Sequence, residues 1–165
     1  MEFPFLNTLT SADGKHTGHI IGQNIAFCRG ISNKWGSLLF PGGGFRENVV
    51  ELPASILAES SYTICMWLKP LKQISWTSIF YVRYQGGFCT FSPFVVGGYS
   101  IFRISEDTDI NGFHDALARQ IPQDTWTFVC VTYDHFTEME KSYINGRKAG
   151  FRADTPSLPA CRQIL

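Results

Sequence analysis

The amino-acid sequence predicts an all-β fold, a sandwich of two antiparallel sheets, and three observations support this prediction. Apolar and polar residues alternate with a two-residue period in many segments, whereas no segment keeps a helical period over several turns. Turns rich in glycine and proline, of which the chain has 15 and 8, separate these segments at intervals of about ten residues. Hydrophobic residues make up 44% of the 165 residues, which is enough to fill a core. We therefore expect residues 1–165 to form a single domain.

Six runs rich in β-branched and aromatic residues predict strands, at residues 61–69, 78–84, 88–91, 99–104, 126–133 and 141–144. The first run ends at Pro70, because proline has no amide hydrogen with which to extend a sheet. The last run leads into Asn145 and Gly146, the dipeptide that most strongly favours a two-residue hairpin turn. Residues 112–120 fit a short helix by local propensity, but neighbouring strands could make them a strand, so both assignments stay open.

Alternation also predicts which face of a strand lies in the core. In residues 61–69 one face carries only large apolar side chains, those of Tyr62, Ile64, Met66 and Leu68. The opposite face carries Thr63, Cys65, Trp67 and Lys69. We therefore expect the first set to face the core between the sheets. Residues 126–131 are apolar on both faces, which indicates a strand that is central in its sheet or covered on both sides.

The chain has five cysteines, at positions 28, 65, 89, 130 and 161, and lacks the Cys-x-x-Cys spacing of a zinc site. Cys65 and Cys130 lie in apolar runs, so we expect two buried free thiols. A Cys65–Cys130 disulfide would need the two strands to be neighbours. The thiols, together with the lack of a visible signal peptide, favour a reducing compartment or a phage particle without deciding between compartments.

The charge and hydropathy of the sequence argue against nucleic acid as a partner and against a membrane span. The 14 Lys and Arg residues balance 14 Asp and Glu residues and are scattered along the chain. Proteins that track nucleic acids instead carry a basic stripe. No apolar stretch approaches the ~20 residues that are needed to span a bilayer. We therefore expect neither nucleic-acid binding nor a membrane span.

Four blocks of sequence follow one another between residues 13 and 147. They are Asp13-Gly14-Lys15-His16-Thr17-Gly18; residues 36–40 with 49–53, GSLLF and VVELP; residues 62–70, YTICMWLKP; and residues 126–134, WTFVCVTYD, with residues 143–147, YINGR. These blocks are similar to the patterns D-x-G-x-x-x-G, G-x-A-L-x-F with V-x-L-P, F-T-I-S-x-W-V-K-P, and W-H-H-V-A-V-T-Y-D with Y-V-D-G. In this order and spacing, the chain resembles the laminin-G-like jelly-roll family, which shares the fold of the concanavalin A-like lectins and glucanases.

The resemblance implies a jelly-roll sandwich of the concanavalin A-like type. Family members continue past the segment that matches residues 160–165 into one or two more strands, which complete a sheet. Either the chain is therefore truncated and lacks these C-terminal strands, or another protein chain covers the edge that ends at Leu165. The resemblance also suggests an extracellular, surface-associated or virion location.

The sequence contains few residues or motifs that indicate catalysis. Concanavalin-type glucanases use paired carboxylates on alternate residues of one strand, and the comparable pair here is Glu138 and Glu140. The resemblance places this pair in a turn between two strands, so we expect two solvated loop carboxylates. A nucleophile elbow, a P-loop and a dinucleotide-binding glycine motif are all absent from the sequence.

Calcium is the cofactor that the resemblance implies, because many family members hold a structural calcium ion at a rim of the sandwich. Asp13 matches the family's early turn, and Asp134 matches the aspartate that ends the fourth block. Carboxylates are ligands that calcium prefers. Either aspartate could instead hydrogen-bond within its own Asx-type turn and need no metal.

Binding is the remaining class of function. On one predicted strand, Tyr81 and Arg83 share a face, and on another Tyr99 and Arg103 do. If both faces line the same side of a sheet, they form an aromatic and guanidinium patch for a sugar or an acidic group. The alternative is that they are ordinary half-exposed strand residues. Further aromatic candidates are Trp35, Trp67 and Trp76.

We therefore predict a non-catalytic recognition module that binds carbohydrate or a glycoconjugate, as part of a larger surface or virion assembly. The alternative is a structural or protein-interaction domain of the same fold, without a glycan site, whose open edge docks on a partner. A glycoside hydrolase or lyase ranks third, because the sequence lacks the carboxylate set that such an enzyme needs.

Overall fold

The computed structural model describes residues 1–32, 36–42, 47–57, 61–106, 113–155 and 161–164. The chain divides into two compact units, Met1–Ile56 with Gln163–Leu165, and Leu57–Arg162. Strands dominate both, and among the described residues the only helical element is a 3-10 turn, η1, at Ala54–Leu57. In this part of the chain no helix has the length and apolar character needed to cross a membrane. The predicted all-β class is confirmed.

The first unit contains two small two-stranded sheets. In one, β1 (His19–Ile21) pairs with β4 (Val49–Glu51), and in the other β2 (Ala26–Arg29) pairs with β3 (Gly36–Leu39). The strands β3 and β4 correspond to the two halves of the second sequence block. The backbone N–H of Leu52 donates to the carbonyl oxygen of Ile164 at 3.0 Å, so the end of the chain returns to this unit.

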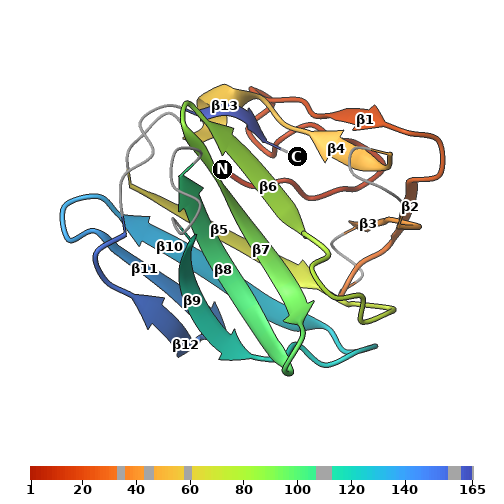
Figure 1. Ribbon diagram of the computed structural model, residues 1–165. Coiled ribbons are helices and arrows are strands. Elements are labelled where there is room, and N and C mark those ends of the chain that lie inside the picture. Colours follow the sequence, from red (N-terminus) through yellow and green to blue (C-terminus); the bar gives the residue numbers. More distant parts are fainter. Residues whose placement is uncertain (33–35, 43–46, 58–60, 107–112, 156–160, 165) are drawn as a thin grey trace. The chain divides into compact units, whose positions relative to one another are not determined.

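Two larger antiparallel sheets, whose strands other than β13 all lie in the second unit, form the two layers of a sandwich (Figure 1). The four-stranded sheet has the order β12-β11-β10-β5, with β5 at Tyr62–Leu68, β10 at Thr127–Asp134, β11 at Met139–Ile144 and β12 at Arg147–Arg152. The five-stranded sheet has the order β13-β6-β7-β8-β9, with β6 at Phe80–Tyr84, β7 at Gly87–Val95, β8 at Tyr99–Glu106, β9 at Phe113–Arg119 and β13 at Cys161–Ile164. The predicted sandwich is therefore confirmed.

The core lies between these two sheets, and in β5 it lies on the face that alternation predicted. In β5, Ile64 and Met66 are more buried than Cys65 and Trp67, which are exposed. In β10 every second residue is buried and the residues between are half-buried, as expected for a strand with neighbours on both sides. The largest fully buried side chains include Phe91, Phe102, Ile104, Val82, Val129 and Val131.

Residues 113–119, left open between helix and strand, form the edge strand β9. They pair with β8 along its length, from Tyr99 opposite Arg119 to Ser105 opposite Phe113. Ala116 is buried on one face of β9, whereas the other face is more exposed. Sheet pairing thus overrides the local helical propensity of this segment. Residue 112 of the segment lies outside the described residues.

The expectation of two buried free thiols at Cys65 and Cys130 is wrong. The two residues lie directly opposite each other in β5 and β10, and a disulfide joins them. Cys65 is exposed and Cys130 half-buried, so the bond lies on the outer face of the four-stranded sheet. The bond removes one of the two observations that favoured a reducing compartment, because disulfides persist in oxidising ones.

The C-terminal segment forms β13, which pairs with β6 at the edge of the five-stranded sheet. Ile164 is 6% exposed, so the end of this strand is buried within the described structure. Leu165, at which the sequence predicted an open edge, lies outside the described residues. Coverage of that edge by another chain stays a prediction.

Candidate functional site

One row of side chains crosses four strands on the outer face of the five-stranded sheet. In the register of the strands, Tyr81 of β6 lies opposite Thr90 of β7, and Thr90 lies opposite Arg103 of β8. Arg103 in turn lies opposite Asp115 of β9. Directly opposed residues of antiparallel strands project to the same face. The neighbour of Arg103 along the strand, Ile104, is buried in the core, so the row faces away from it.

Arg103 is held on three sides. Its Nε and Nη2 atoms donate to the two carboxylate oxygens of Asp115, at 2.6 and 2.8 Å. These side chains are 17% and 24% exposed, so water and salt screen the ion pair less than one on an open surface. Its guanidinium carbon also lies 4.2 Å from the ring centroid of Phe113 and 4.8 Å from that of Trp76. One carboxylate and two π faces therefore fix the orientation of this guanidinium.

Trp76 reaches this face from the loop between β5 and β6. Its backbone N–H donates to the carbonyl oxygen of Phe94 at 3.1 Å, which ties the loop to β7. Trp76 has a φ of 65°, a left-handed conformation that bulky residues rarely adopt. Its side chain stays 51% exposed although it contacts Arg103. A strained backbone that presents an exposed indole beside a guanidinium favours a binding role for this residue.

Tyr81 and Phe88 form a second aromatic group on the same face. Their ring centroids are 5.3 Å apart, and the rings are tilted by only 26°. Thr90, which lies in register between Tyr81 and Arg103, is buried, with its hydroxyl 2.8 Å from Oγ of Ser78. The face therefore combines flat apolar rings, an oriented guanidinium and a carboxylate, the groups with which proteins bind sugars and other polar ring compounds.

The four predicted ligand-binding residues all lie on this face, but they do not form one patch. Arg83 follows Tyr81 by two residues along β6, and Arg103 lies two strands away from that pair. Tyr99 lies at the other end of β8, four residues or about 13 Å from Arg103. Its partner in β9 is Arg119. Whether the four residues bind a ligand stays a prediction.

Sequence reasoning missed Phe88 of β7, and it also missed Phe113 and Asp115. The latter two belong to the segment that stayed open between helix and strand, and a strand assignment would have placed them on one face by alternation. Of the further aromatic candidates, Trp76 joins the site. Trp67 lies on the outer face of the other sheet, 5.2 Å between ring centroids from Phe128. Trp35 lies outside the described residues.

The candidate carboxylate pair, Glu138 and Glu140, does not share one surface. Glu138 is exposed in the turn between β10 and β11, as expected. The expectation that Glu140 is solvated is wrong, because it lies in β11 and is fully buried. Among the described residues its carboxyl oxygens make no hydrogen bond of good geometry, although the backbone N–H of Ala116 lies close enough to lower the pKa of the carboxyl somewhat. Burial, with a further contribution from the Asp115 carboxylate, raises the pKa of Glu140 to about 9, so the group is protonated at neutral pH.

The two candidate calcium ligands accept hydrogen bonds within their own turns. The hydroxyl of Ser11 donates to Oδ1 of Asp13 at 2.5 Å, and the N–H of Lys15 donates to the same oxygen at 3.1 Å. Hydrogen bonds, first of all from the side chains of Ser11 and Thr137, lower the pKa of Asp13 and Asp134 respectively. In the described part of the chain no three His, Cys, Asp or Glu side chains gather as a metal site would need. Calcium at Asp13 or Asp134 therefore stays a prediction.

Residues 42–163 match a laminin-G family model described as the concanavalin A-like lectin/glucanases superfamily. Among solved structures, the chain is similar to domain 4 of AbnA, a GH43 extracellular arabinanase from Geobacillus stearothermophilus, in complex with arabinotriose. The two chains are 19% identical with a TM-score of 0.79, over 98% of this chain and 79% of that one.

A weaker likeness is to the native heptameric SAP-like pentraxin from Limulus polyphemus, with 14% identity and a TM-score of 0.47 over 64% of this chain and 50% of that one. No curated protein sequence matches the chain. The family-model match confirms the predicted concanavalin A-like type, and the likeness to the arabinanase domain, at this identity, concerns the fold alone.

Proposed function

The chain belongs to the concanavalin A-like lectin/glucanases superfamily, and from this premise we propose that it is a non-catalytic module that binds carbohydrate. The proposed site is the outer face of the five-stranded sheet around Arg103, which we call the Arg103 face. It consists of Trp76, Tyr81, Phe88, Arg103, Phe113 and Asp115. We also propose that the module is one part of a larger surface or virion assembly.

The observation that carries the proposal is the exposed indole of Trp76 beside the guanidinium of Arg103. A sugar ring has an apolar face of C–H groups that stacks on an aromatic ring, and a rim of hydroxyls that needs donors and acceptors. The guanidinium can donate to a hydroxyl oxygen, and the Asp115 carboxylate can accept from a hydroxyl. Because Asp115 already orients Arg103, little side-chain entropy is lost when a ligand binds.

The similar arabinanase domain supports carbohydrate as the ligand class, because its structure is a complex with arabinotriose. The carboxylates support a non-catalytic role. A glycosidase needs two carboxyl groups about 5–10 Å apart on either side of one bond. The Arg103 face offers one carboxylate, that of Asp115, and it is paired with Arg103. Glu140 is fully buried, so it cannot serve as the second.

Trp76→Ala tests the proposal, with Trp67→Ala as the matched control. Both tryptophans are about half exposed, at 51% and 48%, but they lie on the outer faces of different sheets. We expect arabinotriose, or the best neutral oligosaccharide from a glycan array, to bind Trp76→Ala about two- to tenfold more weakly, because an aromatic stacking contact contributes about 0.5–1.5 kcal/mol. Trp67→Ala should bind like the unaltered chain in the same calorimetric titration.

Equal losses in the two tryptophan variants would contradict the assignment of the Arg103 face. A blank glycan array, together with a stable oligomer in solution, would instead favour a protein-interaction domain. Polysaccharide cleavage that Glu138→Gln abolishes would contradict the non-catalytic part of the proposal.

A further inference from the structure

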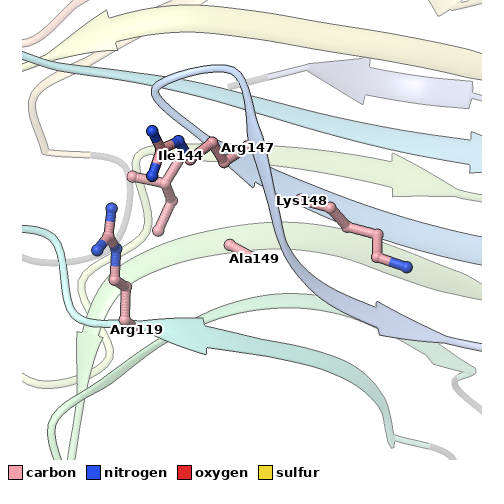
Figure 2. Close-up of a pocket in the computed structure, with 5 residues that line it drawn as sticks. All are labelled: Arg119, Ile144, Arg147, Lys148 and Ala149. Atoms are coloured by element: carbon pink, nitrogen blue, oxygen red, sulfur yellow. The ribbon is translucent and has the colours of Figure 1, made fainter.

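A pocket of about 280 Å³ lies where β9 and the start of β12 meet, away from the row that holds Arg103 (Figure 2). Arg119 ends β9, Ile144 ends β11, and Arg147–Ala149 begin β12; these residues line the pocket. Beyond it β12 packs tightly on β9, because a side chain at Gly150 would overlap the backbone carbonyl of Leu117. The walls of the pocket therefore belong to closely packed strands rather than to loose loops.

Two positive charges converge on this pocket. Figure 2 shows the guanidinium groups of Arg119 and Arg147 on the same side of it, whereas the ammonium group of Lys148 points the other way. Lys148 Nζ lies 5.0 Å from the ring centroid of Phe151 instead. Within the described part of the chain neither guanidinium has an ion pair or a hydrogen bond, and no acidic side chain lines the pocket. Like charges repel, so two unpaired guanidiniums on one pocket favour an anion between them.

Both arginines extend from firmly held backbone. Arg147 follows the β11–β12 hairpin turn, in which Asn145 has the φ of 50° that a tight hairpin turn needs. Asn145 exchanges two hydrogen bonds with the backbone of Phe128, of 2.8 and 3.0 Å. The carbonyl oxygen of Arg119 accepts a hydrogen bond of 2.8 Å from the hydroxyl of Ser100. A site whose backbone is already ordered loses less entropy when a ligand binds.

We propose that Arg119 and Arg147 bind the carboxylate or sulfate group of an acidic saccharide. Planar guanidiniums match these oxyanions through paired N–H donors. Ile144, only 3% exposed, gives the pocket an apolar floor, and Tyr99 lies opposite Arg119 in β8 with half its surface exposed, where a sugar ring can stack. Because the net charge of the chain is zero, this is a local anion site rather than part of an extended basic surface that binds nucleic acid. The choice of a saccharide rests on the proposed function; the anion site does not.

Trigalacturonate is the probe, titrated by calorimetry at low ionic strength and again at 0.15 M salt. Arg119→Gln and Arg147→Gln should each weaken binding at least tenfold, and the double variant should abolish it. Lys148→Gln is the matched control, since it removes one positive charge from the same strand but not from the same side of the pocket. We expect it to weaken binding less than twofold. Circular dichroism confirms that each variant is folded.

Equal losses in Lys148→Gln and Arg147→Gln would overturn the site, because non-specific attraction to a basic surface predicts that result. Inorganic sulfate is added as a competitor. If it competes at the concentration at which trigalacturonate binds, the assignment of a saccharide as the ligand is overturned and the pocket is a site for a free oxyanion. Arabinotriose, measured on the same proteins, separates the two proposals. If trigalacturonate binds through the arginines and arabinotriose does not bind at all, the neutral-glycan role of the Arg103 face fails while the anion site stands.

Discussion

Cys65 of β5 and Cys130 of β10 lie directly opposite each other, and their disulfide joins two neighbouring strands on the outer face of the four-stranded sheet. The next opposed pair on this face, Trp67 and Phe128, packs ring against ring. The bond closes a loop between residues 65 apart in sequence, which contains β6–β9. By restricting the unfolded chain, such a bond stabilises the fold more strongly the longer the loop that it closes.

Replacement of Cys65 and Cys130 by alanine should lower the free energy of unfolding by about 2–4 kcal/mol. Urea denaturation followed by tryptophan fluorescence measures this change. A reducing agent should shift the midpoint of the unaltered chain in the same direction and leave that of the double variant where it is. Cys28→Ser, at an exposed free thiol, is the control and should have little effect. A midpoint of the unaltered chain that is insensitive to reductant would show that the bond does not form.

Glu140 predicts an unusual dependence of stability on pH. Its folded pKa of about 9 exceeds the ordinary value of 4.5, so between these pH values the folded chain keeps a proton that the unfolded chain has released. The contribution of the Glu140 proton to the free energy of unfolding is therefore complete below pH 4.5. It is lost as the pH rises towards 9, at up to about 1.4 kcal/mol per pH unit. Asp115 and Arg152, the charged groups near Glu140, act on this pKa in opposite directions.

Glu140→Gln keeps the shape of the side chain but replaces the carboxyl with an amide, which does not titrate. We expect its free energy of unfolding to vary less between pH 5 and 9 than that of the unaltered chain, and to exceed it at pH 8. Glu138→Gln, in the exposed turn two residues earlier, should leave the slope unchanged. Asp13 and Asp134, whose pKa values are lowered, lose their stabilising effect only as the pH falls below about 4, outside this window. Parallel pH profiles for Glu140→Gln and the unaltered chain would refute the assignment.

Alternation along the chain was sufficient to predict the core face of β5, whereas both faces of β10 are apolar and the sequence predicted only a strand that is central or covered on both sides. Ile64 and Val131, which oppose each other, are both more buried than the residues beside them. A strand buried on one face has only one register that keeps its apolar residues inside, so the pattern and the packing agree. Alternation also grouped Tyr81 with Arg83 and Tyr99 with Arg103, but that Tyr81 and Arg103 share one face follows only from the pairing of β6, β7 and β8.

Features that depend on which strands are neighbours could not be predicted in this way. Cys65 and Cys130 gave no sign in the sequence that their strands pair, and without that knowledge a buried thiol was the simpler expectation. Asp115 lies in a segment whose local propensity favours helix, so its ion pair with Arg103 appears only once β8 and β9 are paired. Alternation along β11 puts Glu140 on the same face as core residues. Burial of a charged carboxylate is costly, however, so the residue type indicates exposure unless the pKa is raised.

Calcium would show itself as a rise in melting temperature when EDTA is replaced by calcium chloride. If Asp13 is a ligand, Asp13→Asn should abolish that rise, because an amide oxygen binds calcium more weakly than a carboxylate does. Asparagine keeps the oxygen that accepts the hydrogen bonds of Ser11 and Lys15, so the turn itself should survive. Asp134→Asn makes the same comparison at the other candidate. Identical melting temperatures in EDTA and calcium would remove the metal from both turns.

Gly150→Ala should destabilise the sandwich although it adds only one methyl group. Gly150 is buried in β12, and a Cβ atom there would overlap the carbonyl oxygen of Leu117 in β9 and crowd Oγ of Ser142. The backbone of two strands would have to separate, at a cost of about 1–3 kcal/mol in the free energy of unfolding. In an open strand position the same substitution is favourable, because alanine restricts the unfolded chain more than glycine does.

Ser142→Ala is the matched control for this contact, since it removes a buried hydroxyl without a partner in the described residues and adds no atom. We expect its midpoint in urea to stay or to rise. The Gly150→Ala/Ser142→Ala pair should remain destabilised, because the overlap with the Leu117 carbonyl persists. If Gly150→Ala were as stable as the unaltered chain, β9 and β12 would not pack as closely as the structure places them. Because the anion pocket lies between the same two strands, Gly150→Ala should also weaken trigalacturonate binding, whereas Ser142→Ala should not.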